Sequence, residues 1–474
     1  MEQMGGMDAA FLAMETPSMH MHVAAVMVFS PEEGMPGGRE GFERVRSVLS
    51  ERLHLVAPFR RRAVMVPLGL HHPVWIEDPA FDLDYHLRRA SLPAPGGPAE
   101  LVAFVGDLIG RPLDTDRPLW EMHVVEGLEH GRVAVVTKVH HAAIDGVSGA
   151  SLLAAFMDLE PDPPPMEPPA RAWRPEAVPS AAEMVVHALA ALAREPEAAA
   201  GVLRRGLDAA TRLRAWGLDL AEEGISQRPP APFSAPRTSL NGSISPHRRV
   251  AVAEVGLGSV LETKRAFSCS VNDVVLAAVG GALGELLAER GQEPERPLVA
   301  LVPVSNRRGR EQGGSANQVS GMLVALDACE RDPAARLRAA AAAAKLAKAQ
   351  ARMVPPELVD GLAEVAFPAL AARAARLVGN LGLFDHLRPP CNVVVSNVRG
   401  PEVPLWCAGS RLEAVYPVGP VVEGVGLNVT VMSYLDRLHM GIVGCRELVP
   451  DVDRLATHVT DAFKELAKAA GREL

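Results

Sequence analysis

The chain has 474 residues, more than one hydrophobic core usually holds, so two domains are expected. Hydrophobic residues make up 48% and charged residues 22%, which is a globular balance, and the formal net charge of -9 does not suggest a nucleic-acid partner. The five cysteines are widely spaced and contain no CxxC pair, so they predict neither a disulfide framework nor a thiolate zinc site.

The N-terminal residues MEQMGGMDAAFLAME lack a basic segment followed by an apolar one. No window approaches about 18 uninterrupted apolar residues, the length that a membrane-spanning helix needs. We therefore expect a cytoplasmic protein without a signal peptide or a transmembrane span. Any contact with a membrane would then be peripheral.

A strand, a turn and a helix are predicted between residues 130 and 160. The segment RVAVVTKVH (132–140) is β-branched and apolar, HAAIDG (141–146) turns the chain, and VSGASLLAAFMDL (147–159) has helical spacing. The prolines of residues 160–180 favour an extended spacer and mark the best domain boundary.

The rest of the chain predicts a helical connector and a second α/β domain. Residues 181–224 are helical in composition and end before a second proline patch. From about residue 248, strands such as RPLVALVPVS alternate with helices such as NDVVLAAVGGALGELLAER and the alanine-rich segment 334–350. The expected organisation is an N-terminal domain at 1–160, a connector at 161–245 and a C-terminal domain at 246–474.

The pair His140 and His141 ends the predicted strand and is the main candidate for chemistry. Successive side chains of a strand point to opposite faces, so the two rings do not readily share a metal, and the chain has no HExxH motif. A histidine at a strand end, followed by small residues, leaves room for a substrate beside its imidazole. Because histidine titrates near pH ~6.5, the ring could accept a proton from a hydroxyl at neutral pH.

Two neighbours of the pair have competing interpretations. Asp145 precedes a helix and suits an N-cap, with Gly146 in the turn, so a structural role is favoured over proton transfer. Ser148 lies in GVSGA, which is close to the nucleophile pattern GxSxG but has Ala150 in place of the last glycine. Composition and spacing alone thus indicate a histidine base in a two-domain α/β protein of unknown substrate.

HHAAIDG resembles the HHxxxDG motif of the bacterial wax ester synthase/diacylglycerol acyltransferase family, a branch of the coenzyme A-dependent acyltransferases. Further blocks occur in the same order and cover most of residues 7–465: PLDTDRPLWEMHVVEGL, SVNDVVLAAVGGAL, VPVSNR, SNVRGPEVPLWCAG and GLNVTVMSYLDRLHMGIVG. The chain departs from the family pattern at Arg399, where a proline is usual, and at Ala316 and Asp436, where glycines are usual. These departures concern loop geometry more than chemistry.

The resemblance implies a fold class and a reaction. The fold is α/β with mixed sheets, in two similar chloramphenicol-acetyltransferase-like domains that enclose the active-site tunnel at their interface. The reaction is transfer of a long-chain acyl group from acyl-CoA, as co-substrate, to diacylglycerol or a long-chain alcohol. No cofactor, metal or nucleic acid is implied, and the expected surroundings are a lipid droplet or the inner membrane surface.

The resemblance also assigns roles to residues. His141 is the general base, His140 its supporting neighbour, and Asp145 holds the loop. Asn272 is the candidate donor to the tetrahedral oxyanion, although it could instead cap the helix that follows it, and Asp273 beside it could also cap that helix. The candidates for substrate contact are Gly146, Asp273, Ser305, Arg307 and Asn397. Two rival functions stay open: a serine hydrolase that uses Ser148, and a non-catalytic lipid-binding relative.

Overall fold

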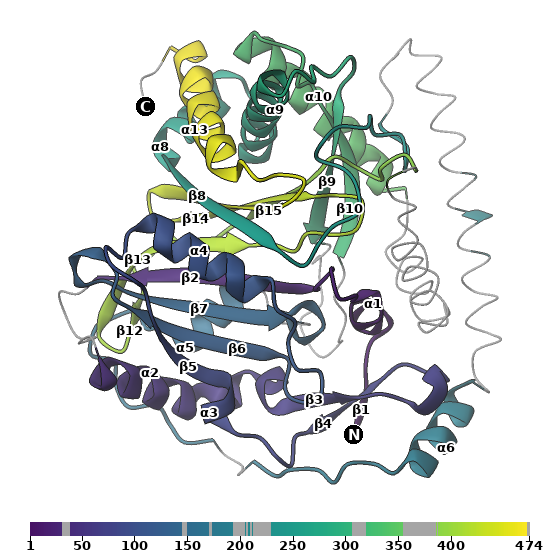
Figure 1. Cartoon of the computed structure of the whole chain (residues 1–474), viewed down its shortest axis with the longest axis vertical. Coiled ribbons are helices and arrows are strands. Elements are labelled where there is room, and N and C mark those ends of the chain that lie inside the picture. Colours follow the sequence, from purple (N-terminus) through teal and green to yellow (C-terminus); the bar gives the residue numbers. More distant parts are fainter. Residues whose placement is uncertain are drawn as a thin grey trace.

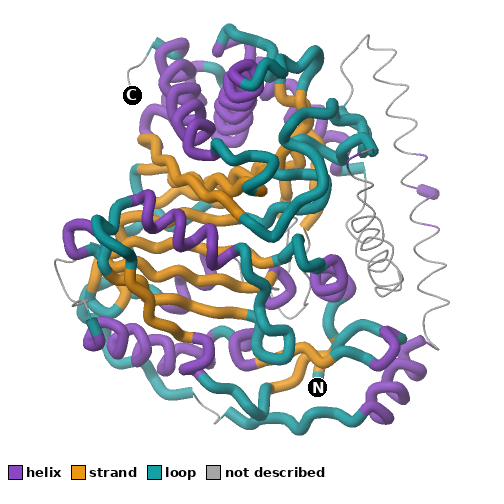
Figure 2. Tube along the Cα trace, in the orientation of Figure 1, coloured by secondary structure: helices purple, strands orange, loops and turns teal. Residues whose placement is uncertain are grey.

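Two six-stranded sheets, each covered by helices, form the two halves of the molecule, and Figures 1 and 2 show them one above the other. The computed structural model describes residues 1–30, 38–144, 149–169, 173–192, 204, 207–208, 211, 229–305, 319–353, 385 and 387–471.

The first sheet has the strand order β12-β13-β2-β7-β6-β5. Its strands are β2 (His22–Phe29), β5 (Leu87–Ser91), β6 (Trp120–Glu126), β7 (Val133–His140), β12 (Trp406–Cys407) and β13 (Ser410–Val418). Only the β5/β6 pair is parallel within this sheet. All eight residues of β7 are buried, as expected for a central strand with helices on both faces.

Helices and a small sheet surround the first sheet. The helices are α1 (Gly6–Met14), α2 (Arg39–Arg52), α3 (Leu83–His86), α4 (Pro98–Ile109) and α5 (Gly149–Phe156). The three-stranded sheet consists of β1 (Glu2–Gln3), β4 (Val74–Glu77) and β3 (Arg61–Val64). α6 (Ala181–Leu192) packs Met184 and Ala188 against this small sheet.

The second sheet has the order β10-β9-β11-β14-β15-β8 and mixes parallel and antiparallel pairs. Its strands are β8 (Arg248–Gly256), β9 (Leu298–Ser305), β10 (Val319–Leu326), β11 (Val393–Val398), β14 (Leu427–Tyr434) and β15 (Arg437–Cys445). The helices are α8 (Leu257–Ala266), α9 (Val271–Glu289), α10 (Pro333–Ala351) and α13 (Val452–Ala469), which share one buried apolar core with the sheet.

The length and composition of α9 would allow it to cross a membrane. However, 72% of its most apolar window is buried inside the fold. α9 packs against both α10 and α13 in the helical layer above the second sheet. Its apolar surface is therefore used as protein core.

The chain crosses between the two halves after β11. β12 and β13 join the edge of the first sheet, where β13 pairs with β2, and the chain then returns to the second sheet as β14. Residues 406–418 thus complete the N-terminal sheet although they lie within the segment 246–474. The predicted limits of the three segments stay a prediction. The first sheet, however, combines strands from the predicted N-terminal and C-terminal domains.

Glycines permit close approaches of backbone between the two halves. A Cβ at Gly441 in β15 would lie 1.8 Å from the carbonyl oxygen of Pro417 in β13. A Cβ at Gly106 in α4 would lie 2.9 Å from the carbonyl oxygen of Arg248 in β8. Backbone therefore meets backbone at both places, and a side chain would force the halves apart.

Candidate active site

His140 is the last residue of β7 and is fully buried. The N–H of Ala142 donates to its Nδ1 at 3.0 Å, so in the neutral ring the proton lies on Nε2. Nε2 in turn lies 3.2 Å from Oε1 of Glu15, a side chain with 16% exposure. The backbone donor therefore fixes the tautomer of this ring, and the carboxylate 3.2 Å from Nε2 favours its orientation.

His141 begins the 3-10 turn η5 (His141–Ile144), where the strand ends. Its N–H donates to the carbonyl oxygen of Met21 at 2.8 Å, and its ring lies against Phe11 with a centroid separation of 4.4 Å. Burial, with a smaller contribution from the neighbouring His140, lowers the pKa of His141 to about 4. The imidazole is therefore neutral at physiological pH, the form that can accept a proton.

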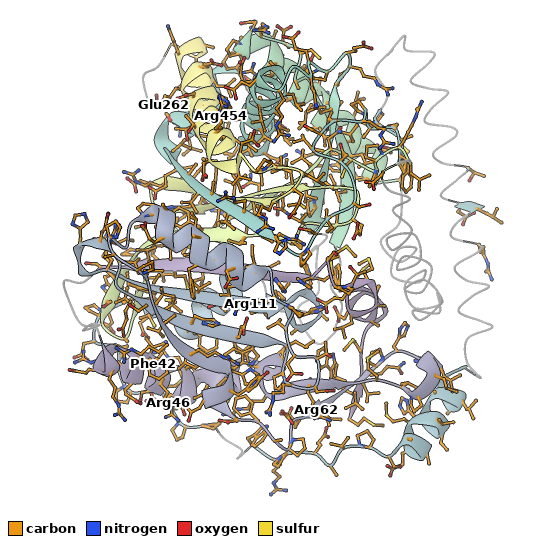
Figure 3. All side chains as sticks on the ribbon, in the orientation of Figure 1. Phe42, Arg46, Arg62, Arg111, Glu262 and Arg454 are labelled. Atoms are coloured by element: carbon orange, nitrogen blue, oxygen red, sulfur yellow. The ribbon has the colours of Figure 1, made fainter. Side chains whose placement is uncertain are left out.

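Lys138, two residues before His140 on β7, is fully buried. Its ammonium donates to the carbonyl oxygens of Leu108 at 3.1 Å and Arg111 at 2.7 Å, and to Oε1 of Glu121 at 2.8 Å. Arg111, labelled in Figure 3, directly follows the C-cap of α4. The charge of Lys138 thus satisfies carbonyls at the negative end of that helix.

Two histidines complete the capping of α4. Nε2 of His22 donates to the carbonyl oxygen of Ile109 at 2.9 Å, and Nε2 of His20 lies 3.2 Å from that of Gly110. Burial lowers the pKa of both rings, and for His22 the charge of Lys138 lowers it further. Both rings are therefore neutral at physiological pH.

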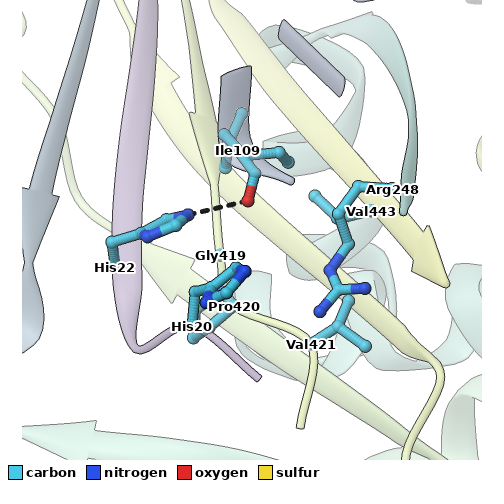
Figure 4. Close-up of a pocket in the computed structure, with 9 residues that line it drawn as sticks. His20, His22, Ile109, Arg248, Gly419, Pro420, Val421 and Val443 are labelled. Carbon is cyan, nitrogen blue, oxygen red and sulfur yellow. Dashed lines mark hydrogen bonds between the residues drawn. The ribbon is translucent and has the colours of Figure 1, made fainter. Parts of the chain in front are cut away.

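His20 and His22 also border a small cavity between the two halves. Figure 4 shows them beside this cavity, which Arg248 of β8 also lines. The volume of the cavity is about 10 Å³, which corresponds to one water molecule. The remaining lining residues are Ile109, Val418, Gly419, Pro420, Val421 and Val443. This cavity is too small for an acyl chain, so it belongs to the packing of the interface.

Asn272 and Asp273 lie in the first turn of α9, in the other half of the molecule, and they have different surroundings. The N-cap is Ser270: its Oγ accepts from the N–H of Asp273 at 3.2 Å, and Asp273 Oδ2 accepts from the N–H of Ser270 at 2.8 Å. The alternative of Asn272 as the cap is therefore wrong, and the capping role of Asp273 is confirmed. Nδ2 of Asn272 is buried and has no hydrogen-bond partner among the described residues.

The other predicted contact residues are only partly described. Asn397 is half-buried near the end of β11, where it pairs with Val431 of β14, and Ser305 is the last residue of β9. Asp145, Gly146, Ser148 and Arg307 lie outside the described residues. Over the described ranges, no group of three or more metal-ligating side chains is placed to hold an ion.

Two neighbours of the histidine pair, Phe11 and Glu15, were missed in the sequence. Both come from α1 and its C-cap, in the apolar stretch AAFLAMETPSMHMH. The available signal was a single acidic residue in that stretch, shortly before His20 and His22. It was not sufficient, because the partner His140 lies far along the chain.

Comparison with known proteins places this chain in a family. The profile of the wax ester synthase/diacylglycerol acyltransferase catalytic domain matches residues 4–275, and that of the family's C-terminal domain matches residues 315–467. A Mycobacterium tuberculosis protein that carries the provisional name diacylglycerol O-acyltransferase is 37% identical over 471 residues, covering 99% of this chain and 91% of that protein.

Solved structures agree with the family and the fold. The wax ester synthase/diacylglycerol acyltransferase from Marinobacter aquaeolei VT8 is 28% identical, with a TM-score of 0.67 over 99% of this chain and 100% of that chain. The starter condensation domain of rhizomide synthetase is 13% identical and shares the fold alone, with a TM-score of 0.53 over 100% of this chain and 95% of that domain. The predicted fold class of two α/β domains with mixed sheets is confirmed. The chain therefore belongs to the wax ester synthase/diacylglycerol acyltransferase family and is an acyltransferase.

Proposed function

We propose that the protein transfers a long-chain acyl group from acyl-CoA to the hydroxyl of diacylglycerol, and also to long-chain alcohols, with His141 as the general base. The observation that carries this proposal is the half-buried His141 ring, neutral at physiological pH and held in the turn η5 directly after β7. The provisional name of the mycobacterial relative supports the acceptor diacylglycerol. The name of the Marinobacter structure supports both acceptors.

The reaction follows from a neutral imidazole beside a hydroxyl. His141 accepts the hydroxyl proton as the alcohol oxygen attacks the thioester carbon, which gives a tetrahedral oxyanion. The oxyanion collapses, the carbon–sulfur bond breaks, and the imidazolium returns the proton to the thiolate of CoA. The products are the ester and free CoA, and the histidine returns to its initial state.

Asn272 is our candidate for the donor that stabilises the oxyanion. Its Nδ2 is buried without a partner among the residues that the structure describes, and leaving such a group unpaired costs about 1–3 kcal/mol unless a substrate or water satisfies it. A fixed donor at the oxyanion contributes about 3 kcal/mol to transition-state stabilisation. In this proposal the tunnel lies between the two halves, so that both contribute to one active site.

The test is release of free CoA from palmitoyl-CoA with dioleoylglycerol, with hexadecanol, or with no acceptor. We expect release that depends on an acceptor, and the relative rates then rank the two alcohols. Release without an acceptor would instead indicate a thioesterase or a serine hydrolase. Labelling with a fluorophosphonate probe identifies a serine nucleophile such as Ser148 directly.

We also propose that the protein is cytoplasmic and binds the surface of a membrane or lipid droplet peripherally through α6. One face of α6 packs against the small sheet, whereas Val186 and Leu189 are 67% and 57% exposed. Such an amphipathic helix suits a lipid interface. The test is co-flotation with liposomes that contain dioleoylglycerol: wild type should float, and V186E/L189E should stay in the soluble fraction. Equal flotation of both proteins would overturn the role of α6.

A further inference from the structure

The helix α1 contacts the histidine pair through two side chains, Phe11 and Glu15. They are four residues apart, and Glu15 is the C-cap of α1, so both lie on the same side of this helix end. The ring of Phe11 lies against His141, with the two rings tilted by 32°, and the carboxylate of Glu15 faces His140. α1 also contacts the turn η5 that begins at His141.

The carboxylate of Glu15 is connected to both histidines. Its Oε1 lies 3.2 Å from Nε2 of His140 and accepts from the N–H of Met21 at 2.9 Å. The carbonyl oxygen of the same Met21 accepts from the N–H of His141 at 2.8 Å. Glu15 therefore acts on His140 directly and on the backbone of His141 through one residue.

The surroundings keep this carboxylate ionised. Burial alone would raise the pKa of Glu15, but the contact with the His140 ring and the hydrogen bond from the N–H of Met21 hold it below its usual value. Lys138 is the other charged group that interacts with Glu15. At neutral pH the neighbourhood of His140 thus includes a fixed negative charge at its protonated ring nitrogen.

We propose that Glu15, supported by Phe11, is a positioning residue that orients the His140 ring and holds the His140–His141 pair for acyl transfer. The carboxylate lies 3.2 Å from Nε2 of His140, the ring nitrogen that carries the proton, while Nδ1 accepts from the N–H of Ala142. A carboxylate beside the protonated nitrogen of a histidine favours one orientation of the ring. This inference rests on the proposed function of His141.

The experiment compares Glu15→Gln and Glu15→Ala with wild type in the acceptor-dependent CoA-release assay. Loss of a partner that orients a working histidine reduces activity by about 10–100-fold in comparable sites. We expect such a loss in kcat for E15A with KM for palmitoyl-CoA nearly unchanged. E15Q should retain more activity, since its amide oxygen can still accept from His140 and Met21.

The matched control is Glu121→Gln. Glu121 is a carboxylate of similar exposure, 19% against 16%, and it binds buried Lys138 instead of His140. We expect E121Q to lower the free energy of unfolding while kcat stays near wild type. If E15A and E121Q both fold and lose kcat equally, the proposal is overturned. The loss would then follow from any change to the buried polar side chains around the histidine pair.

A measurement that does not depend on enzyme activity separates this inference from the proposed function. Long-range ¹H–¹⁵N correlation spectra of histidine-labelled protein report the tautomer of His140, which is assigned by comparison with His140→Gln. We expect the Nε2–H form in wild type, E121Q and E15A, because the N–H of Ala142 still occupies Nδ1, and a changed Nε2–H chemical shift in E15A alone. An unchanged Nε2–H chemical shift in E15A contradicts the role of Glu15. If wild type gives the expected spectra but transfers no acyl group, that result contradicts the proposed function and leaves the role of Glu15 at His140 intact.

Discussion

Oε1 of Glu121 lies 2.8 Å from the ammonium of Lys138, which is fully buried below the end of α4. Burial would raise the pKa of Glu121, but His123 and Lys138 lower it to about 2. A depressed carboxylate pKa stabilises the fold above its unfolded value of 4.5, and that stabilisation is lost as the pH falls towards 2. The pair therefore holds α4 on the sheet throughout the physiological range.

Lys138→Met should destabilise the protein by about 3 kcal/mol, because it leaves the Glu121 carboxylate without its cation and carbonyls at the end of α4 without a donor. Urea unfolding at pH 7 measures this change. The double variant Lys138→Met with Glu121→Leu should recover part of the loss, since no unpaired charge then stays buried. A K138M protein as stable as wild type would show that the ion pair does not hold α4.

The pH dependence of acyl transfer should reflect the lowered pKa of His141. Because that pKa is about 4, the base is already neutral at pH 6, and kcat/KM should show no inflection near the usual histidine value of 6.5. The rate should fall only as the pH approaches 4. The check is a pH profile of CoA release, with each sample returned to pH 7 afterwards to exclude unfolding. A half-maximal rate near pH 6.5 would contradict the account.

Gly441→Ala should destabilise the fold by at least about 2 kcal/mol, since its Cβ would overlap the Pro417 carbonyl, where β13 meets β15. The matched control is Gly258→Ala in α8, where a Cβ meets nothing within 4 Å. That substitution should be neutral or stabilise the helix by up to about 1 kcal/mol. Thermal unfolding of both variants tests this difference. Equal melting temperatures would mean that the two halves are not in such close contact at β13.

Asn272→Ala and Ser270→Ala should separate oxyanion stabilisation from helix capping. N272A removes a donor that has no partner among the described residues, so it should lower kcat by about 10²–10³-fold with little change in stability. S270A removes the N-cap and should cost about 1 kcal/mol of stability while kcat changes little. Kinetics and urea unfolding of the two proteins give the comparison. The reverse pattern would assign Asn272 a structural role.

Local elements were predictable because their periodicity is strong. The strand ending at His140, the helix after Asn272 and the alanine-rich helix at 334–350 all occur, the last with Ala340, Ala344 and Ala347 buried against its neighbours. The crossing of β13 into the first sheet was not predictable. Alternation along SRLEAVYPV predicts a strand, but it does not show which of two sheets the strand joins.

The candidate site was predictable only in part, for a similar physical reason. His140 and His141 are adjacent in the chain, so a motif reveals them. The contacts of Glu15 and Phe11 depend on how α1 folds back onto the end of β7, which no local pattern encodes. The interpretation of Asn272 as a cap failed because Ser270, two residues earlier, already fills that position.

The most direct test of the central claim is CoA release from palmitoyl-CoA in the presence of dioleoylglycerol, measured for wild type and for His141→Ala in parallel with their thermal unfolding. A positioned base contributes about 10²–10⁴-fold, so H141A should lose at least about 100-fold in rate while it unfolds at a temperature close to that of wild type. A folded H141A protein that transfers the acyl group at the wild-type rate would contradict the account.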